Sequence, residues 1–140
     1  MTEEKMTGSE RQRIFTKNLG LLIGWAYQHD FGLTVGEGWR TDEQQRIYIR
    51  TGASRRQRSL HQDRLAHDFN VFHNGLWITQ SEPITPLGDY WESLDPDNIW
   101  GGRFPVYFNT HFTDGDHFEM NPYGAELRAT AAAKAKGDIA

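Results

Sequence analysis

The chain begins with a segment whose apolar residues are spaced as on one face of a helix. In SERQRIFTKNLGLLIGWAYQHDFG (9–32) they return every three or four positions, at Phe15, Leu19, Leu22, Ile23 and Ala26. Ser9 and Gln12 predict a capping box at the start of this helix, and Gly32 predicts its end. The weakly alternating stretch LTVGEGW (33–39) then predicts a strand.

Two further segments predict helices with recognisable ends. TDEQQRIYIRTG has a capping box at Thr41 and Gln44 and a terminating glycine at Gly52. TPLGDYWESLDP has Pro86 at its first helical position, preceded by Thr85. Its apolar residues follow at helical spacing, at Leu87, Tyr90, Trp91 and Leu94.

The remaining segments predict strands and a last helix. Apolar and aromatic residues in LAHDFNVF predict a strand over 65–72, and Asn74-Gly75 predicts a hairpin turn after it. A loop and a strand near His117 follow, and the last helix is expected to begin at Asn121-Pro122. This order of elements predicts an α+β fold in which a small antiparallel sheet is packed with helices.

Length and composition fit one globular domain. The chain has 140 residues, of which 37% are apolar and 24% are charged. We therefore expect a single domain over 1–140 with flexible ends at about 1–8 and 131–140. We also expect the protein to be a monomer. The polar N-terminus lacks a signal-peptide core and no run is long enough to span a membrane, so we expect synthesis in the cytoplasm and no membrane insertion.

Charge and cysteine content exclude several classes of site. The net charge of -4 lacks the basic excess of a dedicated nucleic-acid binder, so we expect no nucleic-acid partner. The absence of cysteine excludes disulfides, thiolate metal sites and cysteine nucleophiles. Basic residues still gather in one segment, at Arg46, Arg50, Arg55, Arg56, Arg58 and Arg64. They fit either a solvated surface or a patch that attracts an anionic polymer.

The segment SLHQDRLAHDFNVF (59–72) crowds titratable residues into the start of an apolar strand. Buried charges are costly unless they are paired or bound to a metal. Strand alternation places Asp68 on a polar face while Phe69 packs on the other. His61 and Asp68 are ligand types that zinc favours, and DGDHFEM offers His117 as the third ligand that a catalytic zinc site needs.

Two residues before His117 are further candidates. Asp114 precedes it by three positions, and a carboxylate beside a zinc-activated water can take its proton and pass it to the leaving amine. His111 is a candidate for a substrate contact or for a hydrogen bond to a ligand. Together, these residues predict a metallohydrolase.

Three segments resemble the motifs of a known family, in the family's order. SLHQDRLAHDF resembles the S-x-H-x-x-G-x-A-x-D motif of the zinc DD-peptidase and L-alanyl-D-glutamate peptidase family, which shares its fold with the hedgehog signalling domain. GWRTDEQQRIY is similar to the family's G-aromatic-R-S/T-x-x-x-Q segment, and DGDHFEM to its closing D/E-x-x-H motif. LGDYWESL and IWGGRF also resemble small phage members, the endolysins that cut peptidoglycan stem peptides.

The resemblance implies a role for each matching residue. His61, Asp68 and His117 would bind Zn²⁺, and Asp114 would be the catalytic carboxylate. Arg40 would hold a substrate oxygen and steady its negative charge, for which a guanidinium is suited, although a simple ion pair with a carboxylate is the alternative.

Two other residues in these segments have open roles. Ser59, the motif serine, would either contact the substrate or brace its loop. Trp100 would form a wall of the cleft, unless it is a core tryptophan before the glycine turn.

The sequence departs from the family pattern at two positions. Arg64 replaces the usual glycine, so we expect a backbone there that requires no glycine conformation. Asp114 stands where many carboxypeptidases of the family have glutamate, which favours the endopeptidase branch.

We therefore expect a zinc-dependent endopeptidase that cuts the L-alanyl-D-glutamate bond of the stem peptide. It would be a phage or prophage endolysin that acts on peptidoglycan after release by a partner such as a holin. One alternative is a D-alanyl-D-alanine carboxypeptidase of the same family. Another is a non-catalytic, zinc-stabilised module that binds the cell wall.

Overall fold

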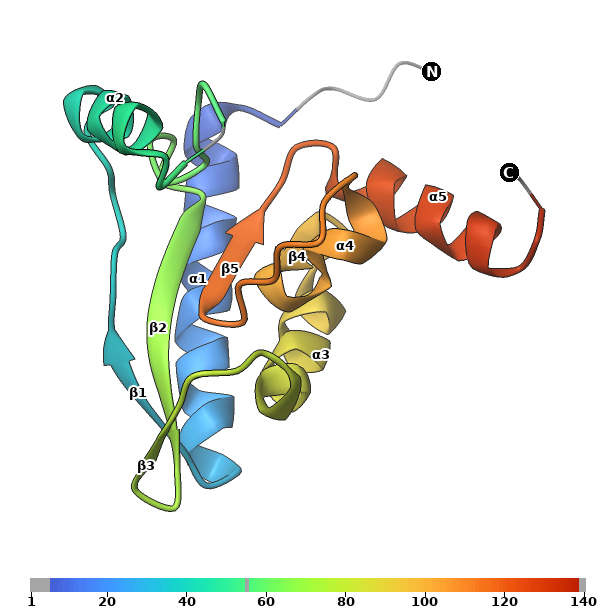
Figure 1. The fold of residues 1–140 in the computed structure, drawn as a ribbon. Coiled ribbons are helices and arrows are strands. Elements are labelled where there is room, and N and C mark those ends of the chain that lie inside the picture. The colour runs from blue at the N-terminus through green and yellow to red at the C-terminus, as the bar shows by residue number, and fades with distance from the viewer. Residues whose placement is uncertain (1–5, 55, 139–140) are drawn as a thin grey trace.

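The computed structural model of this protein describes residues 6–54 and 56–138. The chain folds as an α+β domain in which helices pack on one face of an antiparallel sheet (Figure 1). Its elements are α1 (Gly8–Gln28), β1 (Phe31–Val35), α2 (Asp42–Thr51), β2 (Ala66–His73), β3 (Leu76–Ile78), a 3-10 turn (Glu82–Ile84), α3 (Thr85–Leu94), β4 (Asn98–Trp100), a second 3-10 turn (Gly101–Arg103), α4 (Phe104–Tyr107), β5 (His117–Met120) and α5 (Gly124–Ala135). The predicted fold class is confirmed.

The sheet joins strands that are distant in sequence. Its order is β1-β2-β5-β4, with β3 pairing beside β2 through the hairpin, and every pair is antiparallel. In the pairing of β2 with β5, Asp68 lies opposite His117 and Ala66 lies opposite Glu119. These four residues therefore share one face of the sheet, because side chains in a strand alternate between faces.

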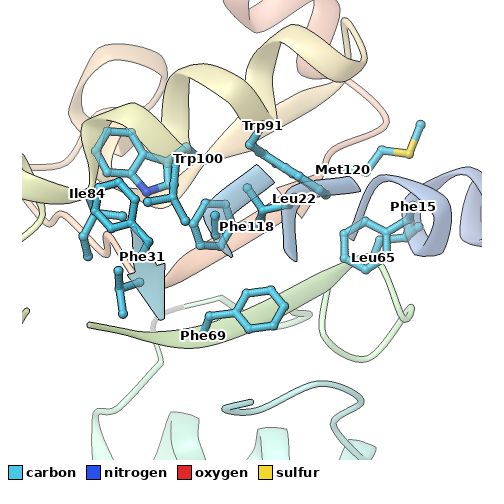
Figure 2. Close-up of a cluster of buried hydrophobic side chains, with 13 residues drawn as sticks. Phe15, Leu22, Phe31, Leu65, Phe69, Ile84, Trp91, Trp100, Phe118 and Met120 are labelled. Atoms are coloured by element: carbon cyan, nitrogen blue, oxygen red, sulfur yellow. The ribbon is translucent and has the colours of Figure 1, made fainter. Parts of the chain in front are cut away.

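The opposite face of the sheet carries the hydrophobic core. Phe69 of β2 packs there against Phe118 of β5, Phe118 packs against Trp91 of α3, and Trp91 contacts Phe15 of α1 (Figure 2). Trp91, Phe69 and Phe118 are almost completely buried. Helices α1 and α3 thus cover the core face, while α2 lies near the beginning of β2, apart from both helices (Figure 1).

The ends of the helices agree with the prediction only in part. For α2, Thr41 accepts a hydrogen bond from the Gln44 backbone at 3.1 Å, and Gly52 has φ 83° as the capping glycine. Helix α1 instead uses Thr7 as its cap, and this side chain accepts from the Glu10 backbone. The helix therefore begins two residues before the position that Ser9 predicted. Thr7 and Glu10 form a T-x-x-E capping pattern equivalent to that of Ser9 and Gln12.

Two further helix boundaries were predicted wrongly. Helix α1 ends at Gln28, because Asp30 takes a left-handed φ of 65°, and Gly32 belongs to β1. Helix α5 begins at Gly124, because the Asn121 side chain first accepts from the Tyr123 backbone in a turn. Residues 131–135, expected to belong to a flexible end, continue α5, while 1–5 and 139–140 lie outside the described residues.

The hairpin prediction is confirmed, and one expectation about a turn is corrected. Asn74 and Gly75 have φ of 52° and 75°, as a type I′ hairpin turn requires. Arg64 also has a left-handed φ, of 59°. The chain therefore does use the conformation that glycine favours here, in the tight turn where Leu65 N donates to Leu60 O at 3.0 Å. The Arg64 guanidinium lies 4.6 Å above the ring of Trp39.

Of the helices in the described part of the chain, none combines the length and the apolar character needed to cross a membrane.

Backbone strain at Arg64 should be measurable by comparing two small replacements. We expect Arg64→Gly to be more stable than Arg64→Ala by about 1 kcal/mol, because both lose the contact with Trp39 and only glycine adopts a left-handed φ freely. Urea unfolding of both purified variants measures the difference. Equal stabilities would show that the turn carries no such strain.

Candidate metal centre

Three side chains from separate parts of the chain converge on one point. His61 lies in the turn before β2, Asp68 on β2 and His117 at the start of β5. Each offers one ligand atom, and these atoms lie within 4.8 Å of one another. Asp68 Oδ1 is 3.3 Å from His61 Nε2 and 3.0 Å from His117 Nδ1. The structure therefore brings together the three predicted ligands in an arrangement that could hold a metal ion.

The backbone of Asp68 is fixed on both sides. On one side it pairs with His117, and on the other Gly36 N donates to Asp68 O while Asp68 N donates to Glu37 O, both at 2.8 Å. Gly36 and Glu37 thus both lie opposite Asp68, as two residues lie opposite one in a β-bulge. A Cβ at Gly36 would lie only 2.9 Å from Asp68 O, so glycine permits this close approach.

Hydrogen bonds at the far ring nitrogens orient both histidines. His61 Nδ1 lies 2.7 Å from the Gly38 carbonyl, and His117 Nε2 lies 2.8 Å from Glu119 Oε1. Because both partners are acceptors, these two nitrogens are assigned as the donors. The lone pairs of His61 Nε2 and His117 Nδ1 are then free to bind a metal beside Asp68. Two imidazole nitrogens and one carboxylate oxygen suit a catalytic zinc site.

The charges around His117 favour a cation. Burial opposes protonation of His117, but hydrogen bonds with Asp68 and Glu119 outweigh burial and raise its pKa to about 10. Burial alone would raise the pKa of Asp68, yet hydrogen bonds from His117 and His61 hold that pKa well below its usual range. Two carboxylates therefore flank one imidazole, and they need a positive charge between them, whether a proton or a metal ion supplies it.

Asp114 stands close to this centre. Its backbone N donates to Gly101 O at 3.0 Å, and its carbonyl accepts from His117 N at 3.1 Å. A Cβ at Gly101 would lie 2.1 Å from Asp114 O, so the glycine turn after β4 sets the position of Asp114. Burial raises the pKa of Asp114, the charge of His117 lowers it and that of Asp68 raises it, with a net upward shift. A carboxylate whose pKa is raised in this way is suited to moving protons.

Arg40 is held by a network beside the centre. Its backbone N donates to His61 O at 3.1 Å, and its guanidinium binds Glu37 and donates to Gln45 Oε1 at 2.7 Å. The guanidinium also lies 4.6 Å above the ring of Tyr48, whose hydroxyl donates to Glu37 at 2.7 Å. The ion pair that the sequence left open as an alternative is therefore present, and it fixes Arg40 in one orientation.

The other predicted site residues have different positions. Ser59 is buried, and its Oγ accepts from His61 N at 3.2 Å, so it braces the turn that carries His61. Trp100 is a core residue, 3% exposed, whose indole donates to Gly115 O at 2.8 Å. It also lines a surface cavity together with Arg103 and Thr113, and its part in substrate binding stays a prediction. His111 is exposed on the loop between α4 and β5, where its role stays a prediction.

Two arginines of the basic segment, Arg56 and Arg58, contact carboxylates near the site. Arg58 donates to Asp63 at 3.0 Å, and Arg56 lies 3.9 Å from Glu119. Arg55 lies outside the described residues.

Sequence reasoning missed Glu119. Its carboxylate is completely buried, accepts from His117 and also accepts from the Asn121 amide at 3.1 Å. The pattern H-x-E in the closing motif could have revealed it, because residues two apart in a strand share a face.

Comparisons with known proteins support the fold. No model of a protein family matches the sequence, and neither does a curated protein. The crystal structure of the L-Ala D-Glu endopeptidase ChiX of Serratia marcescens is similar, with TM-score 0.59 and 23% identity over 81% of this chain and 86% of that one.

A second similar crystal structure is that of the L,D-carboxypeptidase DacB of Streptococcus pneumoniae. It has TM-score 0.56 and 20% identity, over 87% of this chain and 71% of that one. The fold expected from the motif resemblance is thereby confirmed.

Replacing Glu119 by glutamine should weaken metal binding although no ligand is removed. The variant loses the negative charge that accepts the His117 proton, and changes of this kind typically cost about 10- to 100-fold in metal affinity. Competition for Zn²⁺ with a chromophoric chelator measures the change. Glu43→Gln, at an exposed carboxylate on α2, is the matched control, and equal affinities of the two variants would contradict the assignment.

Proposed function

We propose that this protein is a zinc-dependent peptidase that cuts the L-alanyl-D-glutamate bond of the peptidoglycan stem peptide. The observation that carries the proposal is the convergence of His61, Asp68 and His117, with Asp114 three residues before the last of them. The donor set fits zinc, and the neighbouring carboxylate fits a proton carrier.

The residues around the centre would divide the work of hydrolysis. Bound zinc supplies Lewis-acid activation of water and of the carbonyl under attack. Asp114 takes the proton of the attacking water and passes it to the leaving amine. Arg40 uses only part of its five N–H groups on Glu37 and Gln45, so the others can donate to the substrate carbonyl oxygen and stabilise its developing charge.

Two observations favour the L-alanyl-D-glutamate bond. ChiX, whose crystal structure is similar to this chain, is an L-Ala D-Glu endopeptidase. Asp114 is also one methylene shorter than the glutamate of many carboxypeptidases that the motifs resemble. We further propose that the protein is a monomeric phage or prophage endolysin that reaches the wall through a holin, because LGDYWESL and IWGGRF resemble small phage members.

Two alternatives compete with this proposal. A D-alanyl-D-alanine carboxypeptidase would use the same centre, and the similarity to DacB, an L,D-carboxypeptidase, keeps carboxypeptidase activity in consideration. A non-catalytic wall-binding module would need neither Asp114 nor an oriented Arg40, so their presence argues against it.

Muropeptide mass spectrometry separates these activities. With zinc-loaded protein and purified peptidoglycan, we expect release of the stem peptide after its first residue, L-alanine. Loss of only a terminal D-alanine would instead show the carboxypeptidase. Binding to the wall without any new fragment would show the non-catalytic module.

Removing the carboxylate charge of Asp114 should separate catalysis from metal binding. We expect Asp114→Asn to keep its zinc and to lose activity by about 10²- to 10⁴-fold, the usual contribution of a general acid–base group. Metal content and the rate of muropeptide release are measured on the same sample. Asp89→Asn, at an exposed carboxylate on α3, is the control. Full activity of Asp114→Asn with zinc retained would end this mechanism.

A further inference from the structure

Arg56 links the two halves of the candidate site. Its side chain reaches Glu119, with Nη1 lying 3.9 Å from Oε1, and Glu119 holds His117. Its backbone carbonyl accepts from Gln45 Nε2 at 2.7 Å, and Gln45 holds Arg40. We propose that Arg56 is a positioning residue that orients His117 through Glu119 and Arg40 through Gln45. This inference rests on the metal centre of the proposed function and does not depend on the bond that is cut.

The first link satisfies a buried carboxylate. Glu119 is 0% exposed, and within the described part of the chain its side-chain partners besides Arg56 are the His117 ring and the Asn121 amide. A buried carboxylate is stable only when opposite charge and hydrogen bonds compensate its lost hydration. The Arg56 guanidinium is a cation beside this carboxylate, with Nη1 and Oε1 3.9 Å apart, and it helps to keep Glu119 directed at His117 Nε2.

Aromatic rings hold the guanidinium in place. It lies 5.6 Å from the centroid of Phe104 and 5.0 Å from that of Phe108. The ring of Phe104 in turn lies 5.3 Å from the ring of His117. Cations favour the faces of aromatic rings, so Arg56 stays beside Glu119 although its side chain is 41% exposed.

The second link anchors the loop after α2. Gln45 is 1% exposed, and its amide donates both to Arg56 O and to Ser54 Oγ, at 2.7 and 3.0 Å. Its Oε1 is left to accept from Arg40 Nη1 at 2.7 Å. The side chain of Arg56 connects this loop to Glu119 on the sheet. The backbone carbonyl of Arg56 holds the Gln45 amide, which in turn accepts from Arg40. One residue thereby sets the relative placement of a metal ligand and a substrate-binding cation.

The test compares Arg56→Gln, Arg56→Lys and the matched control Arg58→Gln, which removes an exposed arginine two positions away that is paired with Asp63. Zn²⁺ affinity is measured by chelator competition. We expect the affinity of Arg56→Gln to fall by about tenfold, at the lower end of the range for groups that orient a metal ligand. Arg56→Lys should recover most of this loss because it keeps the charge, and Arg58→Gln should bind as the unchanged protein does.

A spectroscopic measurement separates positioning from a general loss of stability. In zinc-loaded protein, ¹⁵N–¹H NMR should show the His117 proton on Nε2 and a protected Nε–H of Arg40. Arg56→Gln should broaden or shift both signals, while urea unfolding identifies any variant that has lost its fold. Unchanged zinc affinity together with unchanged signals in a folded Arg56→Gln protein would overturn the proposal.

A double variant tests the route through Glu119. If Arg56 acts on the metal through that carboxylate, Arg56→Gln should cost little further zinc affinity in a Glu119→Gln protein. Fully additive losses would contradict this route. If the affinities and signals follow the expectation but no muropeptide is released by the unchanged protein, the peptidase proposal fails while the positioning role stands.

Discussion

The pairing of β2 with β5 is the constraint on which the candidate site depends. It places Asp68 directly opposite His117. A slip of one residue would turn one of these side chains into the core, because strand side chains alternate with a period of two. Phe69 and Phe118 oppose such a slip from the other face, where they pack in the core. The same register therefore positions the hydrophobic core and the candidate ligands.

Charges of opposite sign alternate outward from this pairing. Asp68, His117, Glu119 and Arg56 follow one another in contact or close approach. His117 and Glu119 are buried, while Asp68 at one end and Arg56 at the other are partly exposed. Buried ionisable groups are tolerated when each has a partner of opposite charge. A second such group lies beside it, in which Glu37 holds Arg40. The site is thus oriented before any substrate arrives, which is how proteins fix catalytic groups without reorganising them during the reaction.

Local patterns predicted local structure, and tertiary contacts decided the rest. The caps of α2 and the Asn74-Gly75 turn depend on neighbouring residues, and both were predictable. Asp68 was singled out by strand alternation, and His61 and His117 were proposed because imidazole is a ligand that zinc favours. The motif resemblance then gave all three the role of ligands. The left-handed Arg64 and the buried Trp100 depend on close packing that no spacing rule expresses. Glu119 was missed because a charged residue on a strand looks exposed until the covering loop is known.

The separation of the ligands along the chain has a consequence for stability as well. Asp68 and His117 lie 49 positions apart, and the chain has no cysteine with which to form a cross-link. A cation held between them would close that long loop reversibly, as a disulfide does permanently. Binding of the cation would then raise the free energy of unfolding. A low concentration of the ion would therefore lower the stability of the domain as well as leave the candidate site empty.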